Sequence, residues 1–130
     1  MKKLILMIFM LILSSNALAE WSQFANNADK SMFVYVKLPK VVGPLYRVKM
    51  WVLSDFNASQ RFSSFEYKSI TAQWEFDCKE EKSRLLYAAY FNKNMSKGNT
   101  VAIDQNTSKW SPASPGSINE GLWKFACGMD

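Results

Sequence analysis

The 130-residue sequence contains no histidine, and this absence excludes much of the usual chemistry of enzymes. Without histidine, the chain cannot form the Ser-His or Cys-His pairs that activate many catalytic nucleophiles. The commonest ligand of zinc sites is missing for the same reason. The S-x-x-K pattern of serine–lysine enzymes is also absent. We therefore expect a protein that is not an enzyme and that holds no metal and no other cofactor.

Glycine is scarce, with five residues, and neither of the two common glycine-rich phosphate-binding motifs occurs. Positive charge is more plentiful, because 16 Lys and Arg residues stand against 11 Asp and Glu residues, for a net charge of +5. The cations are scattered among acidic residues, whereas nucleic-acid binding normally requires a clustered basic stripe. We expect no nucleic-acid partner.

No apolar run in the sequence is long enough to cross a membrane as a helix. The longest run, Leu4 to Leu13, has ten residues, whereas a spanning helix needs about 20. Lys2 and Lys3 precede the run, and the A-x-A pattern Ala17-Leu18-Ala19 follows it. These are the parts of a secretory signal peptide. We therefore predict that residues 1–19 are a signal peptide and that the chain is exported.

The mature protein is then predicted to be residues 20–130, a length typical of one domain. A lipoprotein would carry a cysteine directly after the cleavage site, whereas position 20 is Glu. We therefore expect no membrane anchor after cleavage, and a location in the periplasm, at the cell surface or outside the cell. Five Trp, five Tyr and eight of the nine Phe residues lie in this part of the chain, and they predict a packed core rather than disorder.

The sequence contains only two cysteines, Cys78 and Cys127. Thiols in an oxidising compartment usually form a bridge, and this one would close a loop of 127 − 78 = 49 residues. A reactive free thiol is the alternative, but no C-x-x-C pair and no histidine is present to activate it. We predict a Cys78–Cys127 disulfide.

Alternating apolar and polar residues predict a set of β-strands. The expected strands are Met32–Leu38, Tyr46–Leu53, Tyr67–Cys78, Ser83–Asn92 and Thr100–Ile103. Ser83–Asn92 is apolar on both faces, so a helix also fits its pattern, but its aromatic content favours a strand. In the third strand, Ile70, Ala72, Trp74, Phe76 and Cys78 share the face that is expected to meet the core. The polar segment Ser54–Phe65 is interpreted as a loop.

The inward faces of the first two strands are predicted to present Met32, Val34, Val36 and Leu38, and then Tyr46, Val48, Met50 and Val52. The C-terminal part changes period. Ser117 and Glu120 fit a capping box, and Ile118, Leu122, Phe125 and Ala126 form one apolar face of a helix. This helix is expected to unwind at or before Cys127. The predicted fold is α+β: an antiparallel meander of five to six strands, with one C-terminal helix packed on one face and tied by the disulfide.

Two groups of polar and aromatic residues admit more than one interpretation. Glu75, Asp77, Glu80 and Glu81 are either an acid/base or metal cluster or, as we favour, a solvated strand face and a charged turn. Tyr35, Trp51 and Tyr67, mixed with Lys37, Arg47 and Lys49, are expected on strand faces opposite the core. Such a face is typical of recognition surfaces, but a second, smaller core or a homodimer seam also fits.

From Val48 onward the sequence resembles the surface-adhesin protein E family of Gram-negative bacteria. The matching segments are Val48–Leu53 with Asp55-Phe56, Tyr67–Ser69, Trp74–Cys78 with Arg84, Trp110–Pro112, Pro115–Ser117, Glu120 and Cys127. The resemblance implies a small antiparallel sheet and a C-terminal helix joined to it by this disulfide. The best-known member is similar to a dimeric surface adhesin that binds vitronectin, laminin and plasminogen. That member is a lipoprotein, and this chain lacks the lipid-bearing cysteine.

The resemblance therefore implies an exported, non-enzymatic binding protein for host extracellular-matrix or plasma proteins, with a homodimer among the expected partners. Its candidate ligand contacts are the basic residues Lys68, Lys79, Lys82 and Arg84, and an ordinary solvated surface is the alternative interpretation of them. The alternative function is a soluble periplasmic structural or assembly factor.

Overall fold

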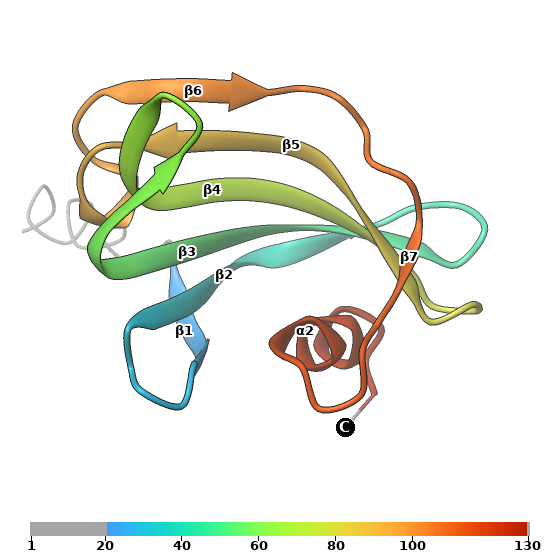
Figure 1. Cartoon of the computed structure of the whole chain (residues 1–130). Helices are drawn as coiled ribbons and strands as arrows, with labels where there is room; N and C mark the ends of the chain where they lie inside the picture. Colours follow the sequence, from blue (N-terminus) through green and yellow to red (C-terminus); the bar gives the residue numbers. More distant parts are fainter. Residues whose placement is uncertain (1–20, 130) are drawn as a thin grey trace, which may run out of the picture.

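In the computed structural model, residues 21–129 are described, and they form an antiparallel sheet with a helix on one side (Figure 1). The elements are β1 (Ser22–Asn26), β2 (Met32–Val42), β3 (Arg47–Phe62), β4 (Phe65–Asp77), β5 (Lys82–Phe91), the short 3-10 helix η2 (Asn94–Ser96), β6 (Thr100–Asp104), β7 (Ser111–Pro112) and α2 (Ile118–Ala126). The predicted signal peptide lies outside the described residues.

Strands β1 to β6 lie in the order of the sequence, and β7 pairs with β5 at the same edge as β6. Every neighbouring pair is antiparallel. The predicted α+β fold, a meander with one C-terminal helix, is confirmed. Two strands were not predicted. β1 exposes most of its side chains at an edge, and β7 is two residues long with a proline, so neither has a clear alternation.

Helix α2 starts at Ile118 because Ser117 caps it. The Oγ atom of Ser117 accepts a hydrogen bond of 3.1 Å from the backbone N–H of Glu120. The carboxylate of Glu120 accepts from the backbone N–H of Gly116, at 3.3 Å, rather than from that of Ser117. One half of the predicted capping box is therefore formed as expected, and the other half is displaced by one residue.

The core lies between α2 and the sheet. Leu122, Trp123 and Ala126 of the helix are buried against the inward side chains of the strands. These inward residues are Val34, Val36, Val48, Met50, Val52 and Phe76. The indole N–H of Trp123 donates to the backbone oxygen of Asp77 at 2.8 Å, so its one polar atom is satisfied. The apolar stripe predicted for the helix and the alternation predicted for the strands therefore meet in one core.

The predicted disulfide is confirmed. Cys78 follows β4 directly, and Cys127 is the C-cap of α2, so the helix ends where the sequence predicted. The two Cα atoms lie 5.5 Å apart. Lys40 supports the same helix end, because its ammonium donates to the backbone oxygen of Phe125 at 2.9 Å. The tail of the molecule is thus held to the sheet both covalently and by a cation.

The prediction of a loop over Ser54–Phe65 is wrong. β3 continues to Phe62, turns at Ser63 and Ser64, and returns as β4 from Phe65. The polar composition hid a strand because the register shifts between Asp55 and Gln60. Such a bulge breaks the period of two and bends the strand. Figure 1 shows this hairpin bending back across β5 and β6.

Two side chains predicted to face the core are exposed instead. Leu38 is 53% exposed and Tyr46 is 71% exposed, whereas Val34 and Val36 are buried as predicted. The register of β2 against β3 shifts between Lys37 and Val41, so the alternation that buries Val36 does not continue into Leu38. Tyr46 lies in the turn before β3 rather than within the strand.

Candidate protein-binding face

The face of the sheet opposite α2 is called here the outer face. The strand register assigns it these residues: Phe33, Tyr35, Lys37, Val41, Arg47, Lys49, Trp51, Leu53, Asp55, Ser69, Thr71, Gln73, Glu75, Asp77, Lys82, Arg84, Tyr87, Ala89 and Phe91. The prediction placed most of its aromatic and basic candidates here, and Tyr35, Lys37, Arg47, Lys49 and Trp51 are confirmed on this face. It has two ends that differ in what covers them.

At one end, the turn that contains η2 folds over the sheet. Leu53 and Ala89 are buried there. The carboxylate of Asp55 accepts from the backbone N–H of Met95 at 2.8 Å and from the side-chain amide of Asn94 at 3.1 Å. This region, formed by Leu53, Asp55, Ser69, Thr71 and Ala89 under η2, is called the closed end. It is a small second core, but its residues are not the aromatic and basic ones for which a second core was an alternative.

Two hydroxyl groups complete the closed end. Ser69 is fully buried, its Oγ donates to the backbone oxygen of Lys93 at 2.6 Å, and it accepts from the backbone N–H of Ser96 at 2.9 Å. The hydroxyl of Thr71 is hydrogen-bonded to that of Ser96. These polar side chains therefore bind the chain's own loop and leave little to recognise a partner.

The middle of the outer face carries half-buried aromatic rings. Trp51 and Tyr87 make an edge-to-face contact, with ring centroids 5.7 Å apart. Lys37 lies beside them in the register and places its ammonium 5.9 Å from the centroid of the Trp21 ring. Rings of this kind bury a large area while remaining accessible, which is typical of binding surfaces.

The other end, called the open end, consists of Arg47, Lys49, Glu75, Arg84 and Trp110. Lys49, Glu75 and Arg84 lie opposite one another on three adjacent strands, so a carboxylate stands between two cations. The Nε atom of Arg84 donates to Oε1 of Glu75 at 2.8 Å, and the Nη2 atom of Arg84 forms an ion pair with the same oxygen at 2.7 Å. Glu75 is only 6% exposed. The prediction of a solvated Glu75 is therefore wrong, because the guanidinium covers it.

Trp110 was not among the predicted site residues. β7 pairs with Lys82 and Ser83 of β5, and this pairing brings the preceding Trp110 to the sheet. The guanidinium carbons of Arg84 and Arg47 lie 4.4 and 5.2 Å from the centroid of its ring. The only sequence signal was its place in a family segment, because strand alternation cannot detect a residue that comes from a loop.

A pocket of about 270 Å³ opens beside these cations. Arg47, Lys49 and Glu75 line one side of it, and Val41 of β2 lines the other together with Gly43, Pro44 and Leu45 of the β2–β3 turn. The Nε atom of Arg47 is buried and has no hydrogen-bond partner within residues 21–129. The sequence did not predict a pocket around Glu75.

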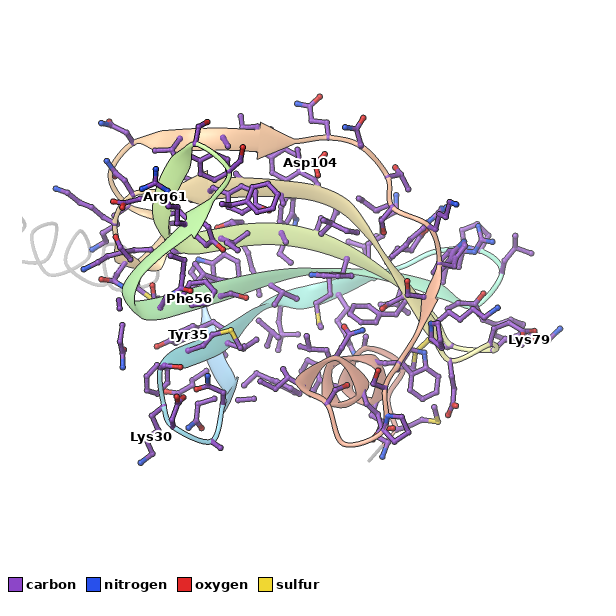
Figure 2. All side chains as sticks on the ribbon, in the orientation of Figure 1. Lys30, Tyr35, Phe56, Arg61, Lys79 and Asp104 are labelled. Atoms are coloured by element: carbon purple, nitrogen blue, oxygen red, sulfur yellow. A yellow bond between two sulfur atoms is a disulfide. The ribbon has the colours of Figure 1, made fainter. Side chains whose placement is uncertain are left out.

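The four predicted ligand contacts do not converge on one site. Arg84 belongs to the open end, and Lys79 and Lys82 are exposed at the turn between β4 and β5. Figure 2 shows Lys79 at the tip of that turn. Lys68 lies nine residues before the end of β4, which is about 30 Å along a strand. Their role as ligand contacts remains a prediction.

Tyr67, predicted for the same aromatic face, lies elsewhere. Its ring contacts those of Tyr90, Phe56 and Phe65, with centroids 5.0, 5.8 and 6.0 Å away. Burial raises the pKa of Tyr90 above its ordinary value, and the nearby Tyr67 and Asp104 add to the effect. This cluster holds the bent β3–β4 hairpin against β5.

Two classes of site are missing from the part of the chain that the structure describes. Within residues 21–129, no group of three or more Cys, Asp or Glu side chains is arranged to hold a metal ion. None of the helices there has the length and apolar character required to span a membrane.

Comparison with known proteins decides the family. The model of the family described as "Surface-adhesin protein E" matches residues 21–128, which is nearly the whole described chain. This chain belongs to the surface-adhesin protein E family. No curated protein matches its sequence. The resemblance stated from the sequence is thereby confirmed.

Solved structures of Haemophilus influenzae protein E share the fold. One crystal form aligns with a TM-score of 0.64 at 9% identity, over 85% of this chain and 85% of that one. A second crystal form gives 0.64 at 8% identity, over 85% and 88%, and the selenomethionine form gives 0.63 at 9%, over 82% and 85%. At such low identity the likeness shows the fold alone.

Membership of the surface-adhesin protein E family indicates an adhesin-like, exported or cell-surface protein. The family points to a binding protein rather than an enzyme.

Proposed function

We propose that this member of the protein E family is an exported binding protein that recognises a host extracellular-matrix or plasma protein through the middle and open end of its outer face. The observation that carries the proposal is the stacking of Arg47 and Arg84 on Trp110, next to the Trp51–Tyr87 pair. Arginine and aromatic residues are enriched in protein–protein interfaces and dominate their binding energy.

The closed end serves as an internal contrast. Its polar groups are already hydrogen-bonded to the η2 turn, so a partner would gain little there. Lys49, in contrast, is exposed and lies at the rim of the pocket. Charged groups at a rim steer association with a partner of opposite charge. Of the two ends of the outer face, the open end is therefore the one that presents cationic and aromatic side chains to a partner.

The test is binding of the purified, processed chain to immobilised vitronectin, laminin and plasminogen. Lys49→Glu is expected to weaken capture by about tenfold, since it reverses a charge at the rim. Lys30→Glu is the matched control, because Lys30 is exposed in the β1–β2 turn, far from Lys79 in Figure 2. If none of the three proteins is captured, or if both variants lose binding equally, the proposal fails.

A second candidate is a soluble periplasmic structural or assembly factor. The observation that favours it is the A-x-A cleavage pattern directly before Glu20, with no cysteine to carry a lipid. Protease treatment of intact cells separates the two candidates. Digestion supports display at the surface. Protection, together with crosslinking in living cells to an envelope partner, supports the periplasmic function. Crosslinking to a second copy would support the homodimer.

A further inference from the structure

We infer that the pocket at the open end binds the carboxylate of an acidic, partly apolar peptide segment of the partner. This deepens the proposed function by naming the chemistry of one contact within the same face. Three observations carry the inference. They are the ion pairing of the cations at the open end, the missing hydrogen-bond acceptor of the Nε atom of Arg47, and the conformation and apolar residues of the β2–β3 turn.

The first observation is the charge pattern. Two rows cross the open end, Lys49–Glu75–Arg84 and Arg47–Asp77–Lys82, so four cations face two carboxylates. Both carboxylates are engaged. Glu75 accepts from Arg84, and one oxygen of Asp77 accepts from the backbone N–H groups of Lys79 and Glu80. Across residues 21–129, neither Arg47 nor Lys49 forms an ion pair. The pocket therefore favours an anion.

The second observation concerns the orientation of Arg47. Its guanidinium lies over the Trp110 ring, and its buried Nε atom has no acceptor among the residues that the structure describes. A buried charged donor without an acceptor is unfavourable, and a carboxylate matches the geometry of a guanidinium better than a neutral oxygen does. An incoming carboxylate would satisfy this donor and lie close to Lys49.

The third observation is the β2–β3 turn. Leu45 and Tyr46 both have positive φ, at 61° and 59°, and the N–H of Arg47 donates to the oxygen of Pro44 at 3.3 Å. This is the type I′ geometry, for which Asn-Gly is the preferred sequence. Large apolar residues are strained in it.

The strained turn also exposes its apolar side chains. Leu45 is 72% exposed and lines the pocket with Val41 and Pro44. Figure 1 shows the turn projecting beyond the sheet at the same end as the β4–β5 turn. Strained conformations that persist at a surface often mark binding sites. An apolar wall beside two cations that form no ion pair within residues 21–129 selects a carboxylate that is carried by an apolar segment.

The size of the pocket favours a peptide over a free small molecule. Its volume of about 270 Å³ is below the range of roughly 300–1,000 Å³ that encloses a whole drug-sized ligand. It is large enough for one side chain of a longer segment. The rest of that segment would lie along the exposed turn.

The experiment follows the Nε–H resonances of the three arginines by nuclear magnetic resonance. Arg47 is the reporter, and Arg61, which is paired with Glu66 and lies outside the open end, is the internal control. The probe is the capped tripeptide acetyl-Leu-Glu-Val-amide, compared with acetyl-Leu-Gln-Val-amide and with free glutarate. We expect a saturable shift of Arg47 with the glutamate peptide. We also expect a dissociation constant about tenfold higher for the glutamine peptide and for glutarate.

Two variants sharpen the test. Lys49→Gln should keep the fold, because the side chain is exposed. It is expected to raise the dissociation constant of the glutamate peptide about tenfold. The double variant Leu45→Asn/Tyr46→Gly relieves the strained turn, so it should raise the Tm by about 4 °C. It also removes the apolar side chains of the turn, so it should weaken binding of the peptide. A gain in stability together with a loss of binding cannot be explained by misfolding.

Each contrary result overturns a stated part of the inference. An unmoved Arg47 resonance, or equal affinity for the glutamate and glutamine peptides, excludes carboxylate binding. Glutarate that binds as tightly as the peptide would make the pocket a small-anion site instead. The proposed function is tested separately. If the matrix proteins bind but the peptide does not, the proposed function stands and the carboxylate pocket is wrong. If the peptide binds but no matrix protein does, the carboxylate pocket stands and the proposed function is wrong.

Discussion

The closed end and the open end of the outer face are built on the same strands, β3 to β5, yet their polar side chains serve different purposes. At the closed end, Asp55 and Ser69 bind the backbone of the η2 turn and are covered by it. At the open end, Arg47 and Lys49 have no ion-pair partner within residues 21–129. One end contributes stability, and the other is available for recognition.

Removing the disulfide is expected to have the largest effect on stability, and it tests whether the two ends of the outer face respond differently. Replacing Cys78 and Cys127 with serine opens a loop with a sequence separation of 49 residues and should lower the free energy of unfolding by roughly 4 kcal/mol. Cys78 lies under the open end, where its N–H donates to the oxygen of Tyr46. Hydrogen exchange should therefore increase most around Tyr46 and α2 and least in η2. Equal increases at both ends would contradict the comparison.

Asp55→Ala tests the closed end. The change removes the acceptor of two hydrogen bonds to the η2 turn and should cost about 3 kcal/mol in urea unfolding. Binding at the open end should be unchanged. Asp29→Ala is the matched control: Asp29 also accepts two hydrogen bonds, both from Ser31, but it is exposed. Its loss should cost clearly less than the loss of Asp55, because water can replace the hydrogen bonds of an exposed carboxylate. A similar cost for both would mean that η2 does not bury its contacts.

Glu75→Gln separates stability from recognition at the open end. Glu75 is buried and Arg84 is partly exposed, so loss of the ion pair should cost about 2 kcal/mol. The same change removes a negative charge beside the pocket and releases Arg84, so acidic peptides should bind more tightly. Glu66→Gln, which breaks an exposed pair with Arg61, should cost less than about 0.5 kcal/mol. Weaker peptide binding by the Glu75 variant would argue against an anion site.

The sequence predicted the part of the fold that repeats with a regular period. Val34, Val36, Met50 and Phe76 are buried as their alternation required, and the helix ends at Cys127 as its apolar face required. Leu38 and Ser54–Phe65 were mispredicted because both lie at register shifts, where the period of two is lost. A register shift depends on the partner strand, so one strand's sequence does not reveal it.

The candidate site was predicted only in outline. Arg47, Lys49 and Trp51 were expected on one face, and alternation places them there. The contributions of Trp110 and of the β2–β3 turn come from loops, whose positions depend on tertiary packing. Glu75 was predicted to be solvated because alternation gives the side of a strand but not the side chain that covers it. The side chain that covers Glu75 is that of Arg84 on the neighbouring strand.

The smallest test uses Tyr90, which follows Ala89 of the closed end in β5 but belongs to the aromatic cluster that holds the bent hairpin. Its pKa is raised above 10.0, chiefly by burial in the aromatic cluster that it forms with Phe62, Phe65 and Tyr67. Above pH 10 the unfolded chain releases this proton more readily than the folded protein does. Stability should therefore decrease as the pH rises through and beyond that value.

Tyrosinate absorbance measured against pH should show one tyrosine that ionises later than the rest, and Tyr90→Phe should remove that late step. The same variant should lessen the alkaline loss of stability measured by urea unfolding. Tyr46→Phe is the control, because Tyr46 is exposed: it should remove one tyrosine from the total absorbance change but leave the late step and the alkaline loss of stability in place. If Tyr90→Phe left the late-ionising tyrosine in place, Tyr90 would not be the buried group, and the hairpin would not be packed against β5 at this end.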